Sequence, residues 1–175
     1  MMTLGSRSEE FMTKVTPDTG YKFAQHTEAA FTRDYPTLTE INSVYGKGTA
    51  DSWLAAQIAD VALFTGAKNL DKYQQRQTAR IIVSEYHYLK ITELLVFFHW
   101  FKCGRYGHFF GSVDPMVITC ALREFIRERN DRLAVYEQEE RERREAEYRK
   151  KNPPTTREEW ERIKAEREQT PENRV

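Results

Sequence analysis

Residues 92–104 read TELLVFFHWFKCG, and this stretch decides the fold. Its apolar side chains would surround a helix axis instead of forming one stripe; they are Leu94, Leu95, Val96, Phe97, Phe98, Trp100 and Phe101. A helix that is apolar on all sides must be packed on several sides. We therefore expect a central helix, with Thr92 as its N-cap, and further helices around it.

The neighbouring segments predict those further helices. Apolar residues at helical spacing predict a helix over residues 49–65, ended by Gly66 in a left-handed conformation. A second helix would begin after an Asp71 N-cap and run to about residue 90. The pair Asp114-Pro115 combines an N-cap with a proline at the first helical position, which predicts the start of the next helix.

Residues 1–36 look different from the rest of the chain. They mix Thr, Ser, Gly and Pro with scattered aromatic residues and show no sustained period of two or 3.6. We expect an irregular N-terminal arm here. Thr37 and Glu40 then have the spacing of a capping box, which predicts a short helix that Gly46 ends.

The C-terminal part is rich in paired charges. Residues 137–151 read EQEERERREAEYRKK and place acidic residues four positions before basic ones, an arrangement worth roughly 0.2–0.5 kcal/mol per pair on a helix. No helix breaker precedes Asn152, so the helix from Pro115 would extend for about 50 Å. A coiled coil is the alternative, but apolar a and d positions are missing beyond Tyr136.

These signals predict an all-α fold, with a compact bundle of about four helices, a glycine-rich inter-helix loop and a long charged C-terminal helix. We divide the chain into an irregular arm (1–36), a helical core domain (37–136), a charged helical extension (137–151), and a Pro-Pro hinge with a short terminal helix (152–175).

The charge balance limits the function classes. The 175 residues include 27 Lys or Arg and 27 Asp or Glu, which excludes a generally polycationic protein. Charge is nevertheless uneven, because residues 66–110 hold seven basic residues and three acidic ones. The longest apolar run, residues 94–101, is much shorter than the roughly 20 residues of a membrane span. With two cysteines and no signal-peptide pattern, we expect a soluble cytoplasmic protein with no membrane partner.

The first candidate binding site is the segment FFHWFKCGRYGHFFGSVDP, residues 97–115. Lys102 and Arg105 could contact phosphates, while Tyr106 and Phe109 could stack on bases, with His108 beside them. The alternative is that the aromatic residues pack into the core and the glycines close a tight turn. Residues 104–107 also fit the GxxG clamp of KH domains, although no strands are evident around them.

A second candidate is the outward stripe of the helix that follows Pro115. Arg123 and Arg127 are spaced to point the same way, as on the recognition helix of a helix-turn-helix variant. Glu124 and Glu128 support the alternative of a solvated face.

The third candidate is a docking surface on the terminal helix, formed by Trp160 and Ile163. The alternative is that this helix folds back on the core. We expect no catalytic residues, no metal and no cofactor, because His99 and Cys103 lack a supporting ligand pattern and no catalytic motif occurs.

Residues 86–130 carry a recognisable series of motifs. LKITEL at residues 89–94 begins a helix, FKCGRYG follows at 101–107, and Phe110-Gly111 and Asp114-Pro115 precede a closing helix. In these motifs the chain resembles an uncharacterised family of small proteins carried by phages and conjugative elements of Bacteroides-type bacteria. The resemblance implies a mobile-element setting. The chain also looks similar to small replication accessory proteins of phages, such as helicase loaders.

We therefore expect a non-enzymatic accessory protein of a mobile element that binds DNA or a replication protein. The alternative is a protein-interaction adaptor, or an inhibitor of a host protein, with no nucleic-acid contact. A small uncharacterised enzyme is the third hypothesis. The oligomeric state stays open.

Overall fold

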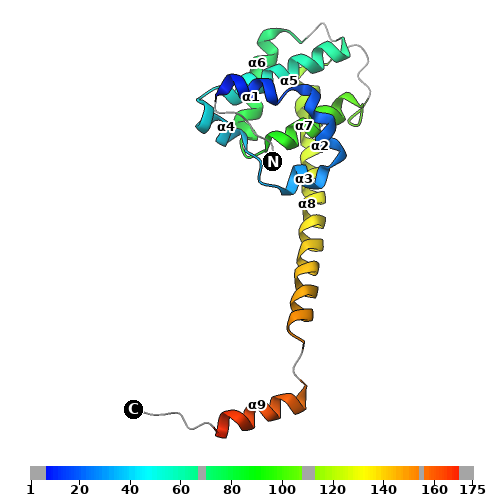
Figure 1. The fold of residues 1–175 in the computed structure, drawn as a ribbon. Helices are drawn as coiled ribbons and strands as arrows, with labels where there is room; N and C mark the ends of the chain where they lie inside the picture. Colours follow the sequence, from blue (N-terminus) through cyan, green and yellow to red (C-terminus); the bar gives the residue numbers. More distant parts are fainter. Residues whose placement is uncertain (1–6, 67–69, 108–112, 154–155, 170–175) are drawn as a thin grey trace. The chain divides into compact units, whose positions relative to one another are not determined.

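The computed structural model describes residues 7–66, 70–107, 113–153 and 156–169, and every regular element in them is helical. The elements in chain order are α1 (Ser8–Lys14), the 3-10 turn η1 (Pro17–Thr19), α2 (Gly20–Gln25), α3 (Thr27–Thr32), α4 (Leu38–Tyr45), α5 (Thr49–Thr65), α6 (Lys72–Glu85), α7 (Ile91–Lys102), α8 (Pro115–Lys151) and α9 (Arg157–Gln169) (Figure 1). The all-α prediction is confirmed. The described helices outnumber the roughly four that were predicted, so the simple bundle is corrected.

Contacts divide the chain into two units, Met1–Tyr136 and Glu137–Val175. The boundary lies within α8, after Tyr136, which is also the predicted end of the core domain. In the first unit α7 is central and α2, α3 and α5 pack against it (Figure 1).

Helix α7 is buried on nearly all sides, as the sequence predicts. Every residue from Ile91 to Phe98 is buried, and so are Trp100 and Phe101. The expected N-cap is wrong by two residues. Lys90 occupies the N-cap, and its backbone N–H donates to the Glu93 carboxylate at 2.9 Å.

Thr92, the expected cap, is fully buried instead. Its hydroxyl donates to the Ala30 carbonyl of α3 at 2.8 Å. The role of this threonine is therefore determined by a residue far away in the sequence, which the neighbouring residues do not reveal.

The N-terminal segment is helical from Ser8 onward, which corrects the predicted irregular arm. Phe11 stacks on Tyr45 with ring centroids 5.1 Å apart, and the Trp53 indole N–H donates to the Val15 carbonyl at 2.8 Å. Helices of six or seven residues are unstable alone, so these tertiary contacts stabilise them.

Helix α2 approaches α7 so closely that its first residue must be glycine. A Cβ at Gly20 would lie 2.8 Å from the Leu95 carbonyl oxygen, inside van der Waals distance. The N-terminal segment is therefore part of the core, and the core domain does not begin at residue 37.

Local capping signals are confirmed at several helix ends. Asp71 accepts from the Gln74 N–H at 2.8 Å, and Asp114 accepts from the Val117 N–H at 2.9 Å. The caps predicted at Thr37 with Glu40 and at Gly66 (φ 66°) are also present. Thr156 and Glu159 form a further capping pair at the start of α9.

A buried ion pair joins α7 to α8. The Glu93 side chain is fully buried, and its Oε1 accepts from Arg129 Nε at 2.9 Å and from Arg129 Nη2 at 2.7 Å. Since Glu93 also accepts from the Lys90 N–H, one carboxylate caps α7 and holds α8 against it.

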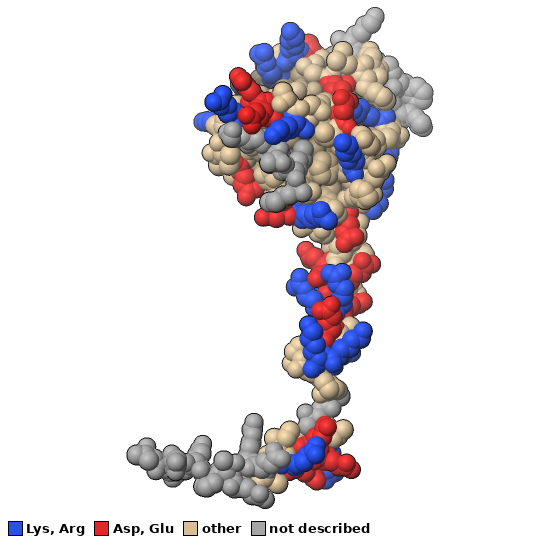
Figure 2. Space-filling model, viewed as in Figure 1, with Lys and Arg blue, Asp and Glu red and all other residues tan. Residues whose placement is uncertain are grey.

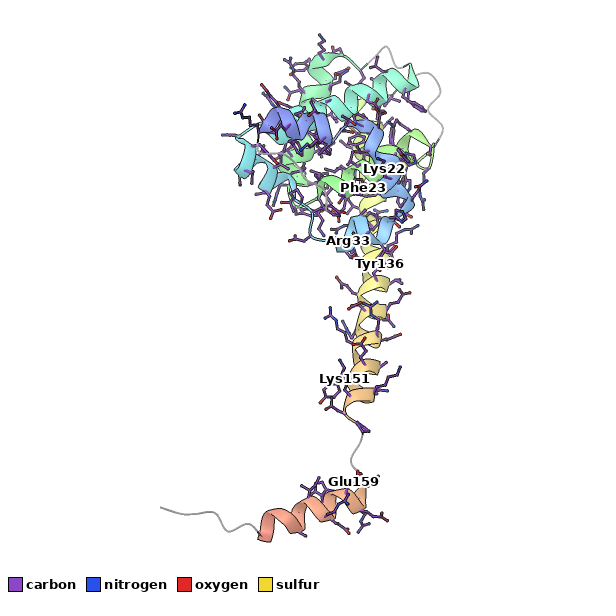
Figure 3. The ribbon with its side chains drawn as sticks, viewed as in Figure 1. Lys22, Phe23, Arg33, Tyr136, Lys151 and Glu159 are labelled. Atoms are coloured by element: carbon purple, nitrogen blue, oxygen red, sulfur yellow. The ribbon has the colours of Figure 1, made fainter. Side chains whose placement is uncertain are left out.

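Within the second unit, basic and acidic side chains alternate along α8 (Figure 2) and stand out around the helix beyond Tyr136 (Figure 3). Glu140 pairs with Arg144 at 3.0 Å and also with Arg143, and Glu145 lies 3.7 Å from Arg149. The predicted self-supporting charged helix is thus present. None of the helices within the described ranges has the length and apolar character needed to cross a membrane.

Candidate functional site

The two basic residues predicted beside the glycine loop are both engaged in ion pairs. Lys102 Nζ lies 2.7 Å from Asp60 Oδ2 and 5.9 Å from the centre of the Phe64 ring. Arg105 pairs with Glu128. Both positive charges are therefore matched by carboxylates from other helices.

Arg105 belongs to an arrangement that we call the Trp100 cluster: Trp100, Arg105, Glu128 and Arg132. The Arg105 guanidinium lies 4.1 Å from the Trp100 ring centre and that of Arg132 lies 5.4 Å from it. Glu128 accepts from Arg132 at 2.9 Å as well as pairing with Arg105. These contacts hold the loop against α7 and α8, so the position of Arg105 is explained by a structural role.

Tyr106 packs inward. Its ring centroid lies 5.9 Å from that of Phe97, and its hydroxyl is buried with no hydrogen-bond partner among the described residues. Burial raises the pKa of this hydroxyl, and the nearby Glu128 carboxylate raises it further. The ring is partly buried against Phe97, so the structure gives no support to the predicted stacking of Tyr106 on a base. The other two loop candidates, His108 and Phe109, lie outside the described residues.

The glycines of the loop serve a turn. Gly104 and Gly107 have φ values of 76° and 115°, and the Gly107 N–H donates to the Gly104 carbonyl at 3.2 Å. The part of the chain that the structure describes holds no strand, so the sheet of a KH domain is missing there.

Arg123 and Arg127 are exposed on α8, as predicted for an outward stripe. The opposite side of the helix is buried through Ile118, Leu122 and Phe125. Glu124 is also exposed beside them, so this face carries mixed charge.

A second basic surface, not predicted from the sequence, lies on α6. Lys72, Arg76 and Arg80 are exposed and four residues apart, and we call them the α6 face. Figure 2 shows basic side chains over the end of the first unit where Figure 1 labels α6. The exposed Tyr73 ring, 69% accessible, lies beside them in the sequence.

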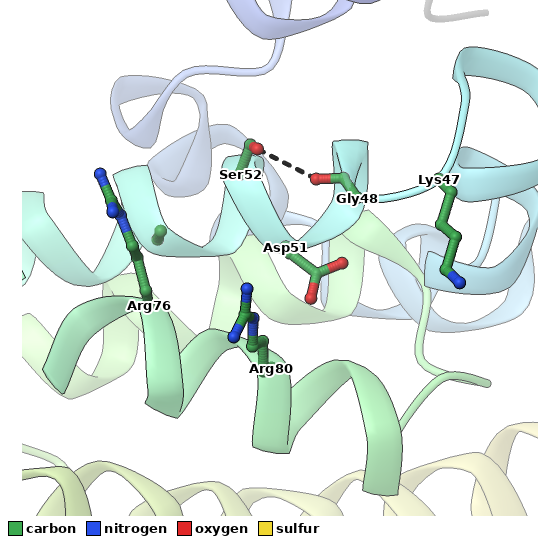
Figure 4. Close-up of a pocket in the computed structure, with 7 residues that line it drawn as sticks. Lys47, Gly48, Asp51, Ser52, Arg76 and Arg80 are labelled. Atoms are coloured by element: carbon green, nitrogen blue, oxygen red, sulfur yellow. Dashed lines mark hydrogen bonds between the residues drawn. The ribbon is translucent and has the colours of Figure 1, made fainter. Parts of the chain in front are cut away.

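The α6 face opens onto a pocket between α5 and α6, which we call the Lys47 pocket (Figure 4). Its volume is about 600 Å³, and it is lined by Lys47, Gly48, Asp51, Ser52, Ala55, Arg76 and Arg80. None of the ion pairs among the described residues involves Lys47, Arg76 or Arg80. The pocket therefore combines three cations with the single carboxylate of Asp51, which leaves an excess of positive charge.

An adjoining pocket of about 490 Å³ shares Lys47, Gly48 and Ser52 with the Lys47 pocket. Residues of α1, among them Met12, line its other side. The shared wall is fixed by a bond from the Ser52 hydroxyl to the Gly48 carbonyl at 3.0 Å (Figure 4).

Two signals in the sequence could have indicated the α6 face. Arg76 and Arg80 repeat at the i, i+4 spacing that places side chains on one helix face, and no acidic residue stands between Asp71 and Glu85. Lys47 gave no such signal, because the α4–α5 turn brings it to α6 only in three dimensions.

In the second unit, Trp160 and Ile163 are 58% and 44% exposed on α9. They lie three residues apart and so share one side of the helix. Lys164 Nζ is 5.7 Å from the Trp160 ring centre.

His99 Nε2 and Cys103 Sγ are 3.7 Å apart on α7 and its C-cap. Across the ranges that the structure describes, no group of three or more His, Cys, Asp or Glu side chains is arranged to hold a metal ion.

Comparison with known proteins gives one match. No curated protein and no solved structure matches the chain. The model of a family of unknown function, DUF6633, matches residues 70–170, which include α6 to α9 but not Lys47 or Asp51. This match covers more than half of the chain, and the protein therefore belongs to the DUF6633 family of unknown function.

Proposed function

We propose that the protein is a non-enzymatic accessory factor that binds nucleic acid through the α6 face and the Lys47 pocket. The observation that carries this proposal is the absence of described ionic partners for Lys47, Arg76 and Arg80. Phosphates attract cations whose charge is available, and binding releases counterions from the nucleic acid.

The spacing of the α6 face supports contact with a strand. Residues four apart on a helix are separated by about 6 Å along its axis, so Lys72, Arg76 and Arg80 form a row that neighbouring phosphates of one backbone can follow. The exposed Tyr73 ring adds a surface on which a base can stack. Cations with an adjacent aromatic ring are typical of surfaces that bind single strands.

The proposal moves the interface away from the glycine loop. Lys102 and Arg105 are matched by Asp60 and Glu128, so phosphate contact there would require breaking ion pairs. The exposed Arg123 and Arg127 remain the competing nucleic-acid surface.

Fluorescence anisotropy with labelled single- and double-stranded oligonucleotides over a range of salt tests the proposal. The double variant Arg76→Gln/Arg80→Gln should weaken binding roughly tenfold and reduce the salt slope by about 1.4 for single strands, or about 1.8 for duplex. Arg123→Gln/Arg127→Gln is the matched control, because it removes the same charge from exposed positions of α8.

Two outcomes would contradict the proposal. Absence of binding at micromolar protein and low salt rejects nucleic-acid binding altogether. Equal losses in the two double variants would show that net charge, rather than the α6 face, determines affinity.

A second candidate function is that of a protein-interaction adaptor, favoured by the exposure of Trp160 and Ile163 on α9. An amphipathic helix with anchors at i and i+3 is suited to a groove on a partner. The double variant Trp160→Ala/Ile163→Ala should lose a partner that the wild-type chain recovers in a pull-down. Unchanged recovery would reject docking through α9.

The motifs at residues 86–130 support a mobile-element setting as part of the proposal, with a replication protein as the associated partner. The genes beside this one provide the test. A neighbouring helicase or primase would support the replication role, and a neighbouring nuclease inhibitor would support the adaptor.

A further inference from the structure

We infer that the Lys47 pocket holds a nucleoside monophosphate group, either as a free nucleotide or as the 5′-phosphorylated end of a strand, an inference that rests on the nucleic-acid function proposed above. The Lys47 pocket and the adjoining pocket together provide one part for the phosphate and one for the nucleoside.

The charge of the Lys47 pocket matches a phosphate monoester. Three cations and the Asp51 carboxylate leave a formal charge of about +2 around the cavity. A phosphate monoester carries about −1.5 to −2 at pH 7, whereas a phosphodiester inside a strand carries about −1. A terminal phosphate therefore compensates the pocket more completely than an internal one.

The positive charge comes from the side chains of Lys47, Arg76 and Arg80. Two N–H groups at the start of α5 already have partners within the protein. The Ala50 N–H donates to Asn42 Oδ1 at 3.0 Å, and the Ser52 N–H donates to the Gly48 carbonyl at 3.0 Å. Arg76 and Arg80 supply planar guanidinium groups, which can donate two parallel hydrogen bonds to phosphate oxygens.

Asp51 indicates what accompanies the phosphate. Its carboxylate lines the pocket between α5 and the arginines of α6 (Figure 4). A carboxylate repels a second phosphate but accepts hydrogen bonds from a hydroxyl or amino group. A nucleoside carries both kinds of donor, whereas inorganic phosphate and a row of phosphates would each leave Asp51 poorly matched.

The adjoining pocket has room for the rest of the nucleotide. It shares Lys47, Gly48 and Ser52 with the phosphate part. On its other side it offers the apolar Met12 side chain together with the Glu9 carboxylate, a second acceptor for the donors of a nucleoside. Its volume is about 490 Å³, and it is largely open to solvent, so a nucleoside in it would stay partly exposed. Met12 is therefore placed to pack against a sugar or a base.

Calorimetric titration of the full chain with adenosine 5′-monophosphate, adenosine and inorganic phosphate tests the pocket. We expect the monophosphate to bind at least roughly tenfold more tightly than adenosine, and Arg80→Gln to remove most of that preference. Asp51→Asn should strengthen binding of inorganic phosphate and reduce the preference for the nucleotide, a reversal that loss of folding would not produce. Arg127→Gln is the control.

Anisotropy with 5′-phosphorylated and 5′-hydroxyl oligonucleotides of one sequence separates the two sources of the nucleotide. Tighter binding of the phosphorylated strand supports capture of a strand end. Binding of the free monophosphate with no oligonucleotide binding supports a nucleotide pocket and rejects the proposed function.

Equal binding of both strands and no binding of the monophosphate would overturn the inference. If the Arg76→Gln/Arg80→Gln variant still bound both oligonucleotides more weakly in that case, the proposed nucleic-acid function would remain although the nucleotide pocket was rejected.

Discussion

Two basic regions of the first unit differ in how their charge is used. Around the glycine loop, Lys102 and Arg105 each meet a carboxylate from another helix. At the α6 face and the Lys47 pocket, Arg76 and Arg80 have no such partner among the described residues. The two arginines of α6 and the two bases of the loop all fall within the basic stretch, residues 66–110. Local composition therefore does not distinguish a structural cation from one available to a ligand.

The two regions differ in ion pairing because of where the acidic residues lie, and not because of the basic residues themselves. Asp60 lies on α5 and Glu128 on α8, far in sequence from the bases they meet. Packing of the helices brings them to the loop. The Lys47 pocket receives only Asp51, which leaves an excess of positive charge.

The largest expected effect is on stability, and it comes from breaking the buried ion pair between Glu93 of α7 and Arg129 of α8. Glu93→Gln should lower the free energy of unfolding by about 3 kcal/mol, because it leaves the mostly buried Arg129 without its counter-charge. Urea unfolding measures the change. Glu124→Gln is the control, because it removes a carboxylate exposed on α8.

The double variant Glu93→Leu/Arg129→Leu sharpens this result. Removing both charges should restore much of the stability that the single variant loses. A loss of less than about 1 kcal/mol in Glu93→Gln would show that the pair contributes no more than an exposed one.

The next effect concerns the Trp100 cluster. Arg105→Gln should lower the free energy of unfolding by about 1 kcal/mol, because it removes both the stacking on Trp100 and the pair with Glu128. Arg80→Gln, a matched change at an exposed position of α6, should alter it by less than about 0.5 kcal/mol. Thermal unfolding of both variants makes the comparison, and equal losses would argue against a structural role specific to Arg105.

A smaller effect tests whether the ion pair with Glu128 prevents Arg105 from binding nucleic acid. Glu128→Gln removes the carboxylate shared by Arg105 and Arg132, so it should raise affinity for an oligonucleotide a few-fold, with a salt slope steeper by about one unit. Glu124→Gln changes the net charge equally on the same helix. If both variants bind alike in anisotropy, pairing does not explain the difference between the regions.

The smallest effect is a pH dependence at His99. Burial lowers the pKa of His99 below its ordinary value of 6.5, and the nearby Lys102 ammonium lowers it further. The unfolded chain then binds more protons than the folded one as pH falls through 6.5, so stability should decrease there. Urea unfolding at pH 7.5 and 5.5 measures this loss of stability, and the His99→Gln variant, which lacks the imidazole, is the control. The expectation would be wrong if the wild-type chain gained stability at pH 5.5 relative to His99→Gln.

Local signals predicted the helices whose ends are set locally. Asp71 and Asp114 cap their helices as expected, and Gly66 ends α5. Thr92 was assigned to the wrong role because its partner, the Ala30 carbonyl, lies 62 residues away. Residues 8–32 were missed because their helices are too short to show a period and depend on tertiary contacts.

The candidate site was predicted less well than the fold. Lys102, Arg105 and Tyr106 were chosen for their residue types, but ion pairs and packing occupy all three. Arg123 and Arg127 stay a prediction, exposed as expected. Lys47 could not be found from sequence, since only the packing of α5 on α6 brings it near the arginines.

Because α7 is buried on all sides, the part of the chain that must fold together is longer than the part that the family model matches. The family match begins at residue 70, yet Gly20, Ala30 and Phe31 contact α7 from before that point. A fragment limited to residues 70–170 would present the apolar side chains of α7 to water and would aggregate or unfold. Domain boundaries for expression or for grafting this module should therefore follow the contacts of α7 rather than the limits of family similarity.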